Sequence, residues 1–482
     1  MLPTSPRTVI SIAVDDSSSV ASLYLSDPKI YARSVSGWFN YWRWAMVFAT
    51  QIVFYGLPWL SIHGRQAMLF DLASRRFYIF NLVLYPQDLI YLTGLLVISA
   101  LSLFLFTAIA GRLWCGYTCP QTVYTEIFMW VERKIEGDRI ARMRLDKSPW
   151  GLDKIARKSA KQAVWLTIGL WTGFTFVGYF TPIKQLAGEV ASFGLGPWEL
   201  FWVLFYGFAT YGNAGWMREQ VCKYMCPYAR FQSAMFDRDT LTVTYDVERG
   251  EGRGSRPRSD TPAQFHAKGL GDCIDCSLCV QVCPTGIDIR NGLQYECISC
   301  SACIDVCNGV MDKMQYPRGL IRNSTENAIA QKSSARQMFK RVLRPRVLVY
   351  TAVLGVITVG MLWSLLTRAN FKVDVQRDRG SVARMVGQGM LENVYRLQIM
   401  NATEQAQTYA IRVAGLEGAL VVPDTAVLVD AASARWVPVR VQMRVNEPSG
   451  MTAGSYPIAF VIAAQNMPLD EVVEKSVFLV PR

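Results

Sequence analysis

Two cysteine runs between Asp272 and Asn308 constrain this chain more than any other feature of its sequence. The first reads Cys273-x2-Cys276-x2-Cys279-x3-Cys283-Pro284, and the second reads Cys297-x2-Cys300-x2-Cys303-x3-Cys307. In such a pattern three thiolates wrap one face of an iron–sulfur cube, and the fourth reaches a neighbouring cube. Two [4Fe–4S] clusters are therefore expected, the first held by Cys273, Cys276, Cys279 and Cys307 and the second by Cys297, Cys300, Cys303 and Cys283.

Zinc and disulfides are the competing interpretations of these eight thiols. Zinc sites pair their cysteines rather than arranging them in two runs of four. Disulfides persist in oxidising compartments, whereas the charge pattern described below places this segment in a reducing one. The second run is followed by Asn308 instead of Pro, so its turn differs while every ligand is retained. We therefore predict a bacterial two-[4Fe–4S] ferredoxin domain over residues 271–320.

The rest of the chain is unusually apolar. Of its 482 residues 51% are hydrophobic and only 18% are charged, against about 25% charged residues in a typical soluble domain. Five apolar windows approach the roughly 20 residues that cross a bilayer as a helix: 44–60, 89–110, 163–180, 198–211 and 347–366. These windows predict a multi-domain membrane protein with about five transmembrane helices. A buried soluble helix is the alternative, and it is strongest for 198–211, because Glu199 lies at its edge.

Lysine and arginine are distributed unevenly among the predicted loops. Residues 111–162 contain eleven of them, whereas residues 181–197 contain only Lys184. Because basic loops remain in the cytoplasm, residues 1–37 and the ferredoxin segment are expected there, and residues 367–482 are expected on the other side. The same pattern accounts for most of the net charge of +12. Membrane lipid is therefore an expected partner and nucleic acid is not, despite the arginine-rich stretch 249–258.

The remaining cysteines form two copies of the motif Cys-x3-Cys-Pro. The copies are Cys115, Cys119 and Pro120, and Cys222, Cys226 and Pro227. Each copy follows an apolar window and a nearby arginine, as in the internal repeats that often share one site in membrane proteins. A spacing of four predicts both sulfurs on one helix face. Two such pairs offer up to four soft ligands for copper(I), zinc or an iron–sulfur centre; the alternative is that each Cys is a small buried hydrophobe.

Histidine offers little as a ligand in this chain. Its two histidines, His63 and His266, lie outside the apolar windows. A bis-histidine haem inside the membrane is therefore not expected, and both residues are interpreted as surface positions.

The C-terminal residues 367–482 predict an Ig-like β-sandwich. Apolar residues alternate at Tyr395, Leu397 and Ile399, as in a strand with one buried face. Asn401-Ala402-Thr403 matches a glycosylation acceptor and is interpreted as a turn between strands. The predicted organisation is an N-terminal segment 1–37, a four-helix core 38–245 that carries both Cys-x3-Cys-Pro motifs, a linker 246–270, the ferredoxin domain 271–320, a linker 321–346, a fifth helix 347–366 and the sandwich 367–482.

Several longer motifs resemble the CcoG family of cytochrome c oxidase accessory proteins, also called FixG or RdxA. They include GRLWCGYTCPQT at 111–122, CKYMCPYAR at 222–230 and VCPTGIDIR at 282–290. Shorter matches are FDL at 70–72, RFYIF at 76–80 and MDKM at 311–314. The order of the parts also matches the family over nearly the whole chain.

The resemblance implies a bacterial inner-membrane protein used in assembling cbb(3)-type haem–copper oxidases. Its activity in the family is reduction of Cu(II) to Cu(I) before delivery by a copper-exporting P-type ATPase. Copper would then be a substrate or transient ligand of Cys115, Cys119, Cys222 and Cys226, and the electron donor is not indicated.

Two other functions are compatible with the same residues. One is a quinol-linked electron-transfer subunit of a respiratory chain, although a simple relay needs neither the fifth helix nor the sandwich. The other is a copper or cluster assembly scaffold without enzymatic activity. The sequence gives no indication of the oligomeric state.

Overall fold

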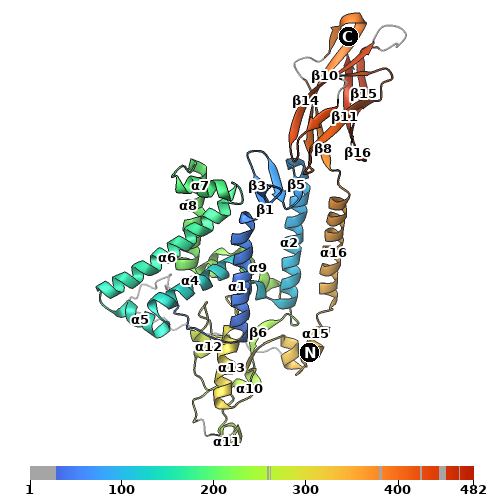
Figure 1. Ribbon diagram of the computed structural model, residues 1–482. Coiled ribbons are helices and arrows are strands. Elements are labelled where there is room, and N and C mark those ends of the chain that lie inside the picture. Colours follow the sequence, from blue (N-terminus) through green and yellow to red (C-terminus); the bar gives the residue numbers. More distant parts are fainter. Residues whose placement is uncertain are drawn as a thin grey trace, which may run out of the picture.

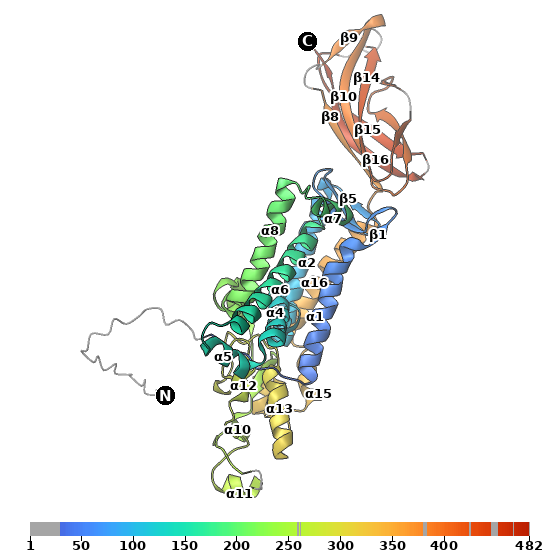
Figure 2. The same ribbon diagram turned by 60° about the vertical axis from the view of Figure 1, so that its left-hand side comes forward.

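The protein is described here from a computed structural model. It describes residues 29–257, 260, 262–378, 383–423, 426–444, 452–465 and 467–481. Most of the predicted N-terminal segment, residues 1–28, and Arg258 of the arginine-rich stretch lie outside the described residues. The described chain forms an elongated molecule with a helical bundle in the middle, a small ferredoxin-like domain at one end and a β domain at the other (Figures 1 and 2).

Five helices of the bundle correspond to the five apolar windows, and connecting elements lie between them. These five are α1 (Trp38–Gly56), α2 (Leu89–Ala110), α6 (Leu152–Val177), α8 (Pro197–Tyr211) and α16 (Pro345–Leu366). The connecting helices are α3 (Leu113–Tyr117), α4 (Pro120–Glu136), α5 (Arg139–Lys147), α7 (Ile183–Ala191) and α9 (Pro227–Met235), with the short helical turns η1 (Leu57–Trp59), η2 (Pro86–Asp88), η3 (Gly212–Met217) and η4 (Val221–Met225).

Small residues allow two helices of the bundle to approach closely. A Cβ atom at Gly169 of α6 would lie 2.7 Å from the Gly207 carbonyl oxygen of α8, and one at Gly173 would lie 2.2 Å from the Val203 carbonyl oxygen. Gly169-x3-Gly173 is thus a small-residue stripe of the kind that brings membrane helices into backbone contact.

Two of the described helices are long and apolar enough to cross a membrane. They are α2 with its preceding turn, Pro86–Ala110, and α16, Pro345–Leu366, with mean hydropathies of 2.4 and 2.0. The windows 44–60, 163–180 and 198–211 also form helices, namely α1, α6 and α8. However, α8 has only 15 residues, and α6 begins with a strongly charged turn that includes Lys154, Arg157 and Lys158. The arrangement with five spans therefore stays a prediction.

The ferredoxin-like domain is closed by pairing of strands far apart in sequence. Strand β6 (Thr242–Tyr245) pairs antiparallel with β7 (Ile321–Ser324), just outside the two cysteine runs. Between them lie α10 (Val247–Gly250), α11 (Pro262–Ala267), α12 (Leu278–Gln281), η5 (Ile289–Asn291) and α13 (Ala302–Met314). The segments predicted as linkers therefore carry regular elements, and α14 (Glu326–Ala330) and α15 (Ala335–Lys340) lead into α16.

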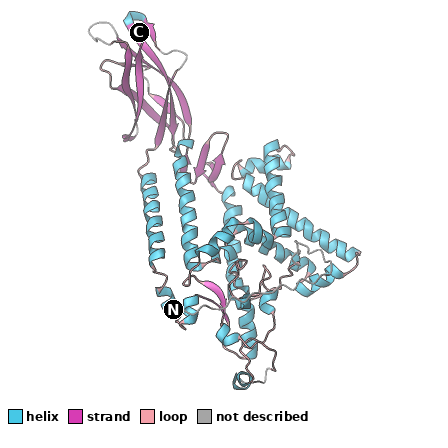
Figure 3. Cartoon of the chain, turned by 180° about the vertical axis from the view of Figure 1, so that it is seen from behind, coloured by secondary structure: helices cyan, strands magenta, loops and turns pink. Residues whose placement is uncertain are grey.

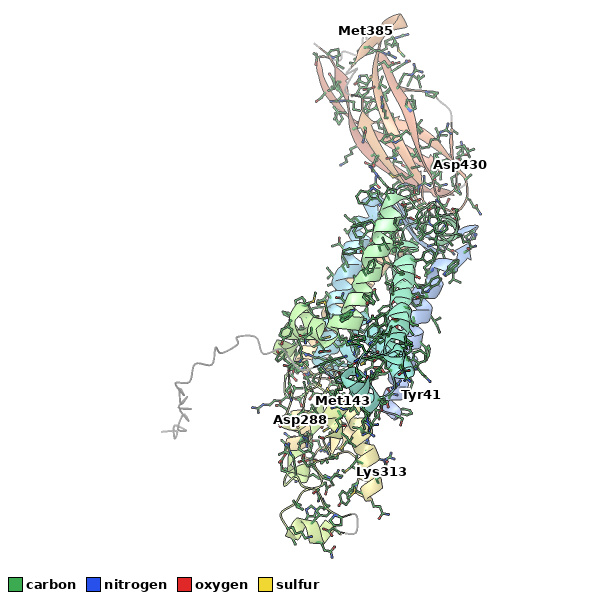
Figure 4. The ribbon with its side chains drawn as sticks, turned by 90° about the vertical axis from the view of Figure 1, so that its left-hand side faces the viewer. Tyr41, Met143, Asp288, Lys313, Met385 and Asp430 are labelled. Carbon is green, nitrogen blue, oxygen red and sulfur yellow. The ribbon has the colours of Figure 1, made fainter. Side chains whose placement is uncertain are left out.

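This domain is attached directly to the bundle. The Asp305 carboxylate of α13 accepts hydrogen bonds from the backbone N–H groups of Phe39 and Asn40, at 3.3 and 2.8 Å. It thereby caps the first turn of α1, which has no cap from its own chain segment. Residues 29–37 cross the same junction, where the Arg33 N–H donates to the Gln281 carbonyl oxygen at 2.8 Å. Tyr41 of α1 and Met143 of α5 mark this junction in Figure 4.

The C-terminal residues form a two-sheet sandwich, as Figure 3 shows at the far end of the molecule from the ferredoxin-like domain. One sheet has the order β12-β14-β10-β8 with β9 beside β10, and the other has the order β13-β11-β15-β16. The strands are β8 (Phe371–Arg377), β9 (Arg384–Val386), β10 (Met390–Asn401), β11 (Gln407–Ala414), β12 (Leu420–Val422), β13 (Val427–Val429), β14 (Ala434–Arg444), β15 (Gly454–Ala464) and β16 (Met467–Val480), with a turn η6 at Gly387–Gly389.

The predicted alternation in this domain matches its core. Tyr395, Leu397 and Ile399 of β10 are fully buried against the facing sheet. The side chain of Asn401 is buried at the end of β10, where its Nδ2 donates to the carbonyl oxygens of Gln405 and Asp430 at 2.7 and 3.1 Å. The motif at 401–403 is therefore a turn, as predicted.

A small sheet between α1 and α2 connects the bundle to the sandwich. It consists of β3 (Met68–Asp71), β4 (Arg76–Ile79) and β5 (Leu82–Leu84), beside the two-stranded pair β1 (Ser61–Ile62) and β2 (Arg65–Gln66). The Tyr85 hydroxyl donates to the Asn401 carbonyl oxygen at 2.8 Å. Asp88, which is 2% exposed, pairs with Lys372 and with Arg368, the latter at 3.2 Å. The sandwich is thus attached to the bundle through this sheet as well as through α16.

Candidate electron-transfer site

The four cysteines predicted for the first cluster surround one cavity. A space of about 370 Å³ is lined by Cys273, Cys276, Cys279 and Cys307, together with apolar residues such as Leu278 and Met311. Cys307 comes from the second run, as the predicted crossing of ligands requires. Figure 4 shows Asp288 and Lys313 at the end of the molecule that contains this domain.

The four cysteines predicted for the second cluster surround a neighbouring cavity of about 350 Å³. Its walls include Cys297, Cys300, Cys303 and Cys283, and Cys279 of the first set also reaches it. The two cavities therefore adjoin, and each has three thiols from one run and one from the other. Each predicted set of four thiols thus lines one cavity, and the binding of a cluster by each set stays a prediction.

The backbone around both cavities repeats the same unusual conformation. Asp275 and Ser277 flank Cys276 with φ angles of 53° and 51°, and Ser299 and Ser301 flank Cys300 with φ angles of 54° and 59°. Non-glycine residues rarely adopt these left-handed angles, and such angles occur in loops whose N–H groups form anion-binding hollows around iron–sulfur clusters. The residues present therefore fit two anionic clusters in equivalent positions.

The chemistry of the donor set also fits a cube. Each cavity has four cysteine thiols on its walls, the ligand set that holds a [4Fe–4S] cluster. Burial raises the pKa of the Cys297 and Cys307 thiols to about 12, so iron binding there must displace protons.

The two cavities differ in their exposure to solvent. Two thiols of each set are buried, namely Cys273 and Cys279 in the first and Cys297 and Cys300 in the second, but only the first set has an exposed thiol, that of Cys276. The buried side of the second cavity is the side on which the bundle lies.

The Cys-x3-Cys-Pro motifs do not place their cysteines on one helix face, so this expectation was wrong. Cys115 lies in α3, which ends at Tyr117, and Cys119 is the N-cap residue of α4. Cys222 lies in η4, a π-helical turn, and Cys226 is the N-cap of α9. The proline that follows each second cysteine explains the break, because it lacks an N–H and disfavours helical backbone at the preceding residue.

The four thiols of the two motifs nevertheless lie together. Cys115 and Cys222 pack on the same apolar group, and burial, with contributions from neighbouring Cys119 and Cys222, raises the pKa of Cys115 to about 12. Burial also raises the pKa of Cys222 to about 11, with contributions from Cys119 and Cys226. The internal repeat therefore places its two copies at a common site. Like the ligands around the two cavities, these thiols do not converge on a single ion in the described structure.

This four-thiol site lies against the second cluster's ligands. A Cβ atom at Gly116 would lie 2.9 Å from both N and Cα of Cys300 and 2.7 Å from the Ile298 carbonyl oxygen. Cys115 and Cys222 pack on the same apolar group that contains Cys300 and Ala302. The sequence analysis missed this contact, and the glycine inside the first motif was the one signal that could have indicated a close backbone approach.

Buried charges on α4 support the site from the bundle side. Glu132 is 2% exposed, and its carboxylate pairs with Arg142 at 2.7 Å, Arg218 at 3.1 Å and Lys161 at 3.5 Å. Nearer the cysteines, Glu126 pairs with Arg43 of α1. The two histidines are elsewhere: His63 lies in the turn between β1 and β2, and the His266 ring packs at a tilt against Phe265.

Comparison with known proteins matches three parts of the chain. Residues 217–326 match a family model described as a 4Fe-4S dicluster domain. Residues 92–137, which include Cys115 and Cys119, match a model described as a 4Fe-4S binding domain. Residues 361–481 match a model described as an IG-like fold at the C-terminal of FixG.

Three relatives align with most of the chain. The nitrogen fixation protein FixG of Rhizobium meliloti is 38% identical over 453 residues, which cover 86% of each chain. The chain belongs to the FixG/RdxA family. Proteins RdxB and RdxA of Cereibacter sphaeroides are 39% and 35% identical over 403 and 404 residues, covering 82% of this chain and 83% and 84% of their own.

A solved structure of a FixG-related protein from Vibrio parahaemolyticus covers 23% of this chain and 97% of its own length, with 21% identity and a TM-score of 0.20. As a family member with [4Fe–4S]-binding domains, the chain is a FixG-like iron–sulfur electron-transfer protein.

Proposed function

We propose that this protein reduces Cu(II) to Cu(I) at Cys115, Cys119, Cys222 and Cys226, with electrons that pass through its two clusters. The observation that carries the proposal is the contact of Gly116 with Cys300, because it brings the four-thiol site against the ligands of the second cluster. Thiolates are soft ligands that favour Cu(I) over Cu(II). A copper ion bound there is stabilised in its reduced form, beside a source of single electrons.

The exposure of the clusters supports one direction of flow. The exposed ligand Cys276 makes the first cluster accessible to a soluble one-electron donor, and the buried second cluster adjoins the thiols. Clusters held by the cysteines of the two cavities would supply single electrons from that donor. One such electron would reduce one Cu(II) to Cu(I) at the four thiols, with the donor as the reductant.

A cavity beside the four-thiol site supports access for a small ion. A space of about 340 Å³ is lined by Cys222 and by Glu219, Glu126 and Met129. Carboxylate and thioether groups are hard and soft copper ligands respectively. Arg43 and Arg218 also line this space, and they pair with Glu126 and Glu132.

The setting of this activity is proposed from the family and from the charge pattern. We place the protein in the bacterial inner membrane with five spans, the ferredoxin domain in the cytoplasm and the sandwich in the periplasm. Copper reduced on the cytoplasmic side would serve a copper-exporting P-type ATPase and, through it, assembly of a cbb(3)-type oxidase. Reporter fusions after each predicted span, and at both ends, test this topology.

A single-turnover experiment without oxygen tests the activity. The clusters are reduced chemically, the reductant is removed, and Cu(II) is added to the wild type and to a variant with Ser at positions 115, 119, 222 and 226. We expect cluster oxidation with an equal amount of Cu(I) in the wild type, and neither in the variant once its clusters are shown to be intact. Equal oxidation in both contradicts the four-thiol site, and no oxidation in either contradicts the reductase.

The same experiment separates the two other functions. Copper binding at the four thiols without electron transfer indicates an assembly scaffold. Cluster reduction by an added quinol, without any response to copper, indicates a respiratory relay.

A further inference from the structure

The two motifs carry arginines whose surroundings differ. Arg218 precedes Cys222, and its guanidinium pairs with Glu132 at 3.1 Å and lies over the Trp165 ring. Arg112 precedes Cys115 and is 3% exposed, but it forms no ion pair with a carboxylate in the part of the chain that the structure describes. Both copies of the repeat therefore have an arginine before the first cysteine, but only Arg218 has a carboxylate partner among the described residues.

Arg112 is instead surrounded by carbonyl groups and sulfur. Its Nη2 donates to the Ala229 carbonyl oxygen, and its Nη1 lies 3.5 Å from the Cys297 carbonyl oxygen, at the outer limit of a hydrogen bond. Its Nε is buried without a partner among the described residues. The groups that interact with its charge are the thiols of both motifs and of one cluster ligand, namely Cys115, Cys222, Cys226 and Cys297.

A buried charge of this kind needs an opposite charge close by. An isolated buried guanidinium is strongly unfavourable unless it is paired. Among the described residues, the sulfurs close to Arg112 become negative when they bind metal, because a bound thiol is deprotonated. The Tyr228 hydroxyl also interacts with Arg112, but burial raises its pKa and keeps it neutral. A cluster held by four thiolates is anionic and gains further negative charge when it is reduced. The surroundings of Arg112 are therefore complete only in the metal-loaded protein.

We propose that Arg112 is a positioning residue for electron transfer, because its guanidinium is the counter-charge shared by the second cluster and the four-thiol site. When an electron leaves the second cluster for Cu(II), negative charge moves from one neighbour of Arg112 to another. A fixed charge between them stabilises the electron in both places and needs little rearrangement. The part that concerns copper rests on the proposed function, whereas the effect on the second cluster does not.

A redox titration of the copper-free protein tests this role. The two clusters are reduced stepwise and followed by electron paramagnetic resonance in the wild type and in Arg112→Gln, Arg112→Lys and Arg218→Gln. A Cys276→Ser variant assigns the signals to the two clusters. For Arg112→Gln we expect the reduction potential of the second cluster to fall by about 59 mV, which is a tenfold change in its reduction equilibrium. The potential of the first cluster should not change. Arg112→Lys, which keeps the charge, should restore most of the potential, and Arg218→Gln should leave both potentials unchanged.

Copper reduction in a single turnover is measured in the same variants. Loss of a partner outside the ligand set commonly costs 10–100-fold in affinity or activity, so we expect a decrease of about that size in Arg112→Gln. Unchanged potentials in Arg112→Gln, or equal shifts of both clusters, overturn the proposal.

Two further outcomes are decisive. If Arg112→Gln fails to retain its clusters, Arg112→Lys decides: a wild-type potential of the second cluster supports the proposal, and a shift of tenfold or more overturns it. A selective shift in Arg112→Gln, in a wild type that does not reduce copper, contradicts the proposed function and leaves the role of Arg112 at the second cluster supported.

Discussion

The two cluster cavities have the same ligand spacing, nearly equal volumes and left-handed residues on both sides of their central cysteine, yet their surroundings differ. The first has an exposed cysteine at its surface, and the second is covered by the bundle. The cysteine spacing therefore accounts for the ligands of each cavity, whereas contacts outside the domain account for the difference between the two cavities. Under the proposed function, the first cluster would receive electrons from the donor and the second would pass them to copper.

The largest effects on copper reduction are expected from two variants, each of which removes one ligand of one cluster. Cys300→Ser removes a buried ligand of the second cluster, and we expect it to abolish Cu(II) reduction in a single turnover. Cys276→Ser removes the exposed ligand of the first cluster, so single-turnover reduction from a chemically reduced second cluster should persist while sustained turnover with a protein donor is lost. Stopped-flow absorbance of the clusters together with a Cu(I) chelator measures both. Loss of single-turnover reduction in Cys276→Ser would show that the first cluster, and not the second, is adjacent to copper in the reaction.

Separation of the second cluster from the four-thiol site is the next largest effect. Gly116→Ala places a methyl group 2.7 to 2.9 Å from backbone atoms of Ile298 and Cys300. Overpacking of this kind costs about 1–3 kcal/mol of stability, and it should slow electron transfer because the two backbones must move apart. Thermal unfolding and single-turnover rates check the two effects.

Gly309→Ala is the matched control for that substitution. Gly309 lies in α13 of the ferredoxin-like domain, and a Cβ atom there meets nothing within 4 Å. Because Ala is favoured over Gly inside a helix by about 1 kcal/mol, this variant should be slightly stabilised and should transfer electrons at the wild-type rate. Equal destabilisation of both variants would contradict the close contact at Gly116.

The affinity of the four-thiol site for Cu(I) should depend on pH. Burial raises the pKa of Cys115 to about 12 and of Cys222 to about 11, so both thiols are protonated at neutral pH. Copper must displace these protons, and the affinity should therefore rise with pH by up to about tenfold per unit for each proton released. Competition with a Cu(I) chelator between about pH 6 and 9, which lies below both pKa values, measures the slope. A flat profile would mean that these thiols are ionised before copper binds.

The smallest predicted effect concerns the attachment of the ferredoxin-like domain to α1. Asp305→Ala removes the carboxylate that caps α1 through Phe39 and Asn40, and loss of such a cap costs about 1 kcal/mol. Gln281 occupies the corresponding position in the first run, but its contact with Arg33 uses its backbone carbonyl oxygen. Gln281→Ala should therefore leave the thermal unfolding temperature nearly unchanged. A decrease as large as that of Asp305→Ala would contradict the cap.

The parts of the site that the sequence predicted are those that depend on local spacing. The assignment of eight cysteines to two cavities follows from residues within about 35 positions of each other, where the chain has few alternative paths. The β-sandwich followed from alternation along single strands such as β10. Each of these patterns is contained in one short segment.

The parts that the sequence did not predict depend on contacts between distant segments. Gly116 and Cys300 are far apart in the chain, and no periodicity connects them. The break between Cys115 and Cys119 was readable from Pro120, but the spacing of four was given more weight. Helices α1, α6 and α8 showed apolar windows, and their charged or short ends become evident only when each helix is seen whole.

The ion pairs of Asp88 with Arg368 and Lys372 restrict the orientation of the sandwich relative to the bundle. A domain on one flexible stalk sweeps a wide arc and meets other molecules in every orientation. A domain that is attached at a second point presents the same face to every molecule that approaches it. The second fastening is also the beginning of α2, whose 22 residues span about 33 Å and end beside Arg112. Helix α2 therefore has the sandwich at one end and the four-thiol site at the other.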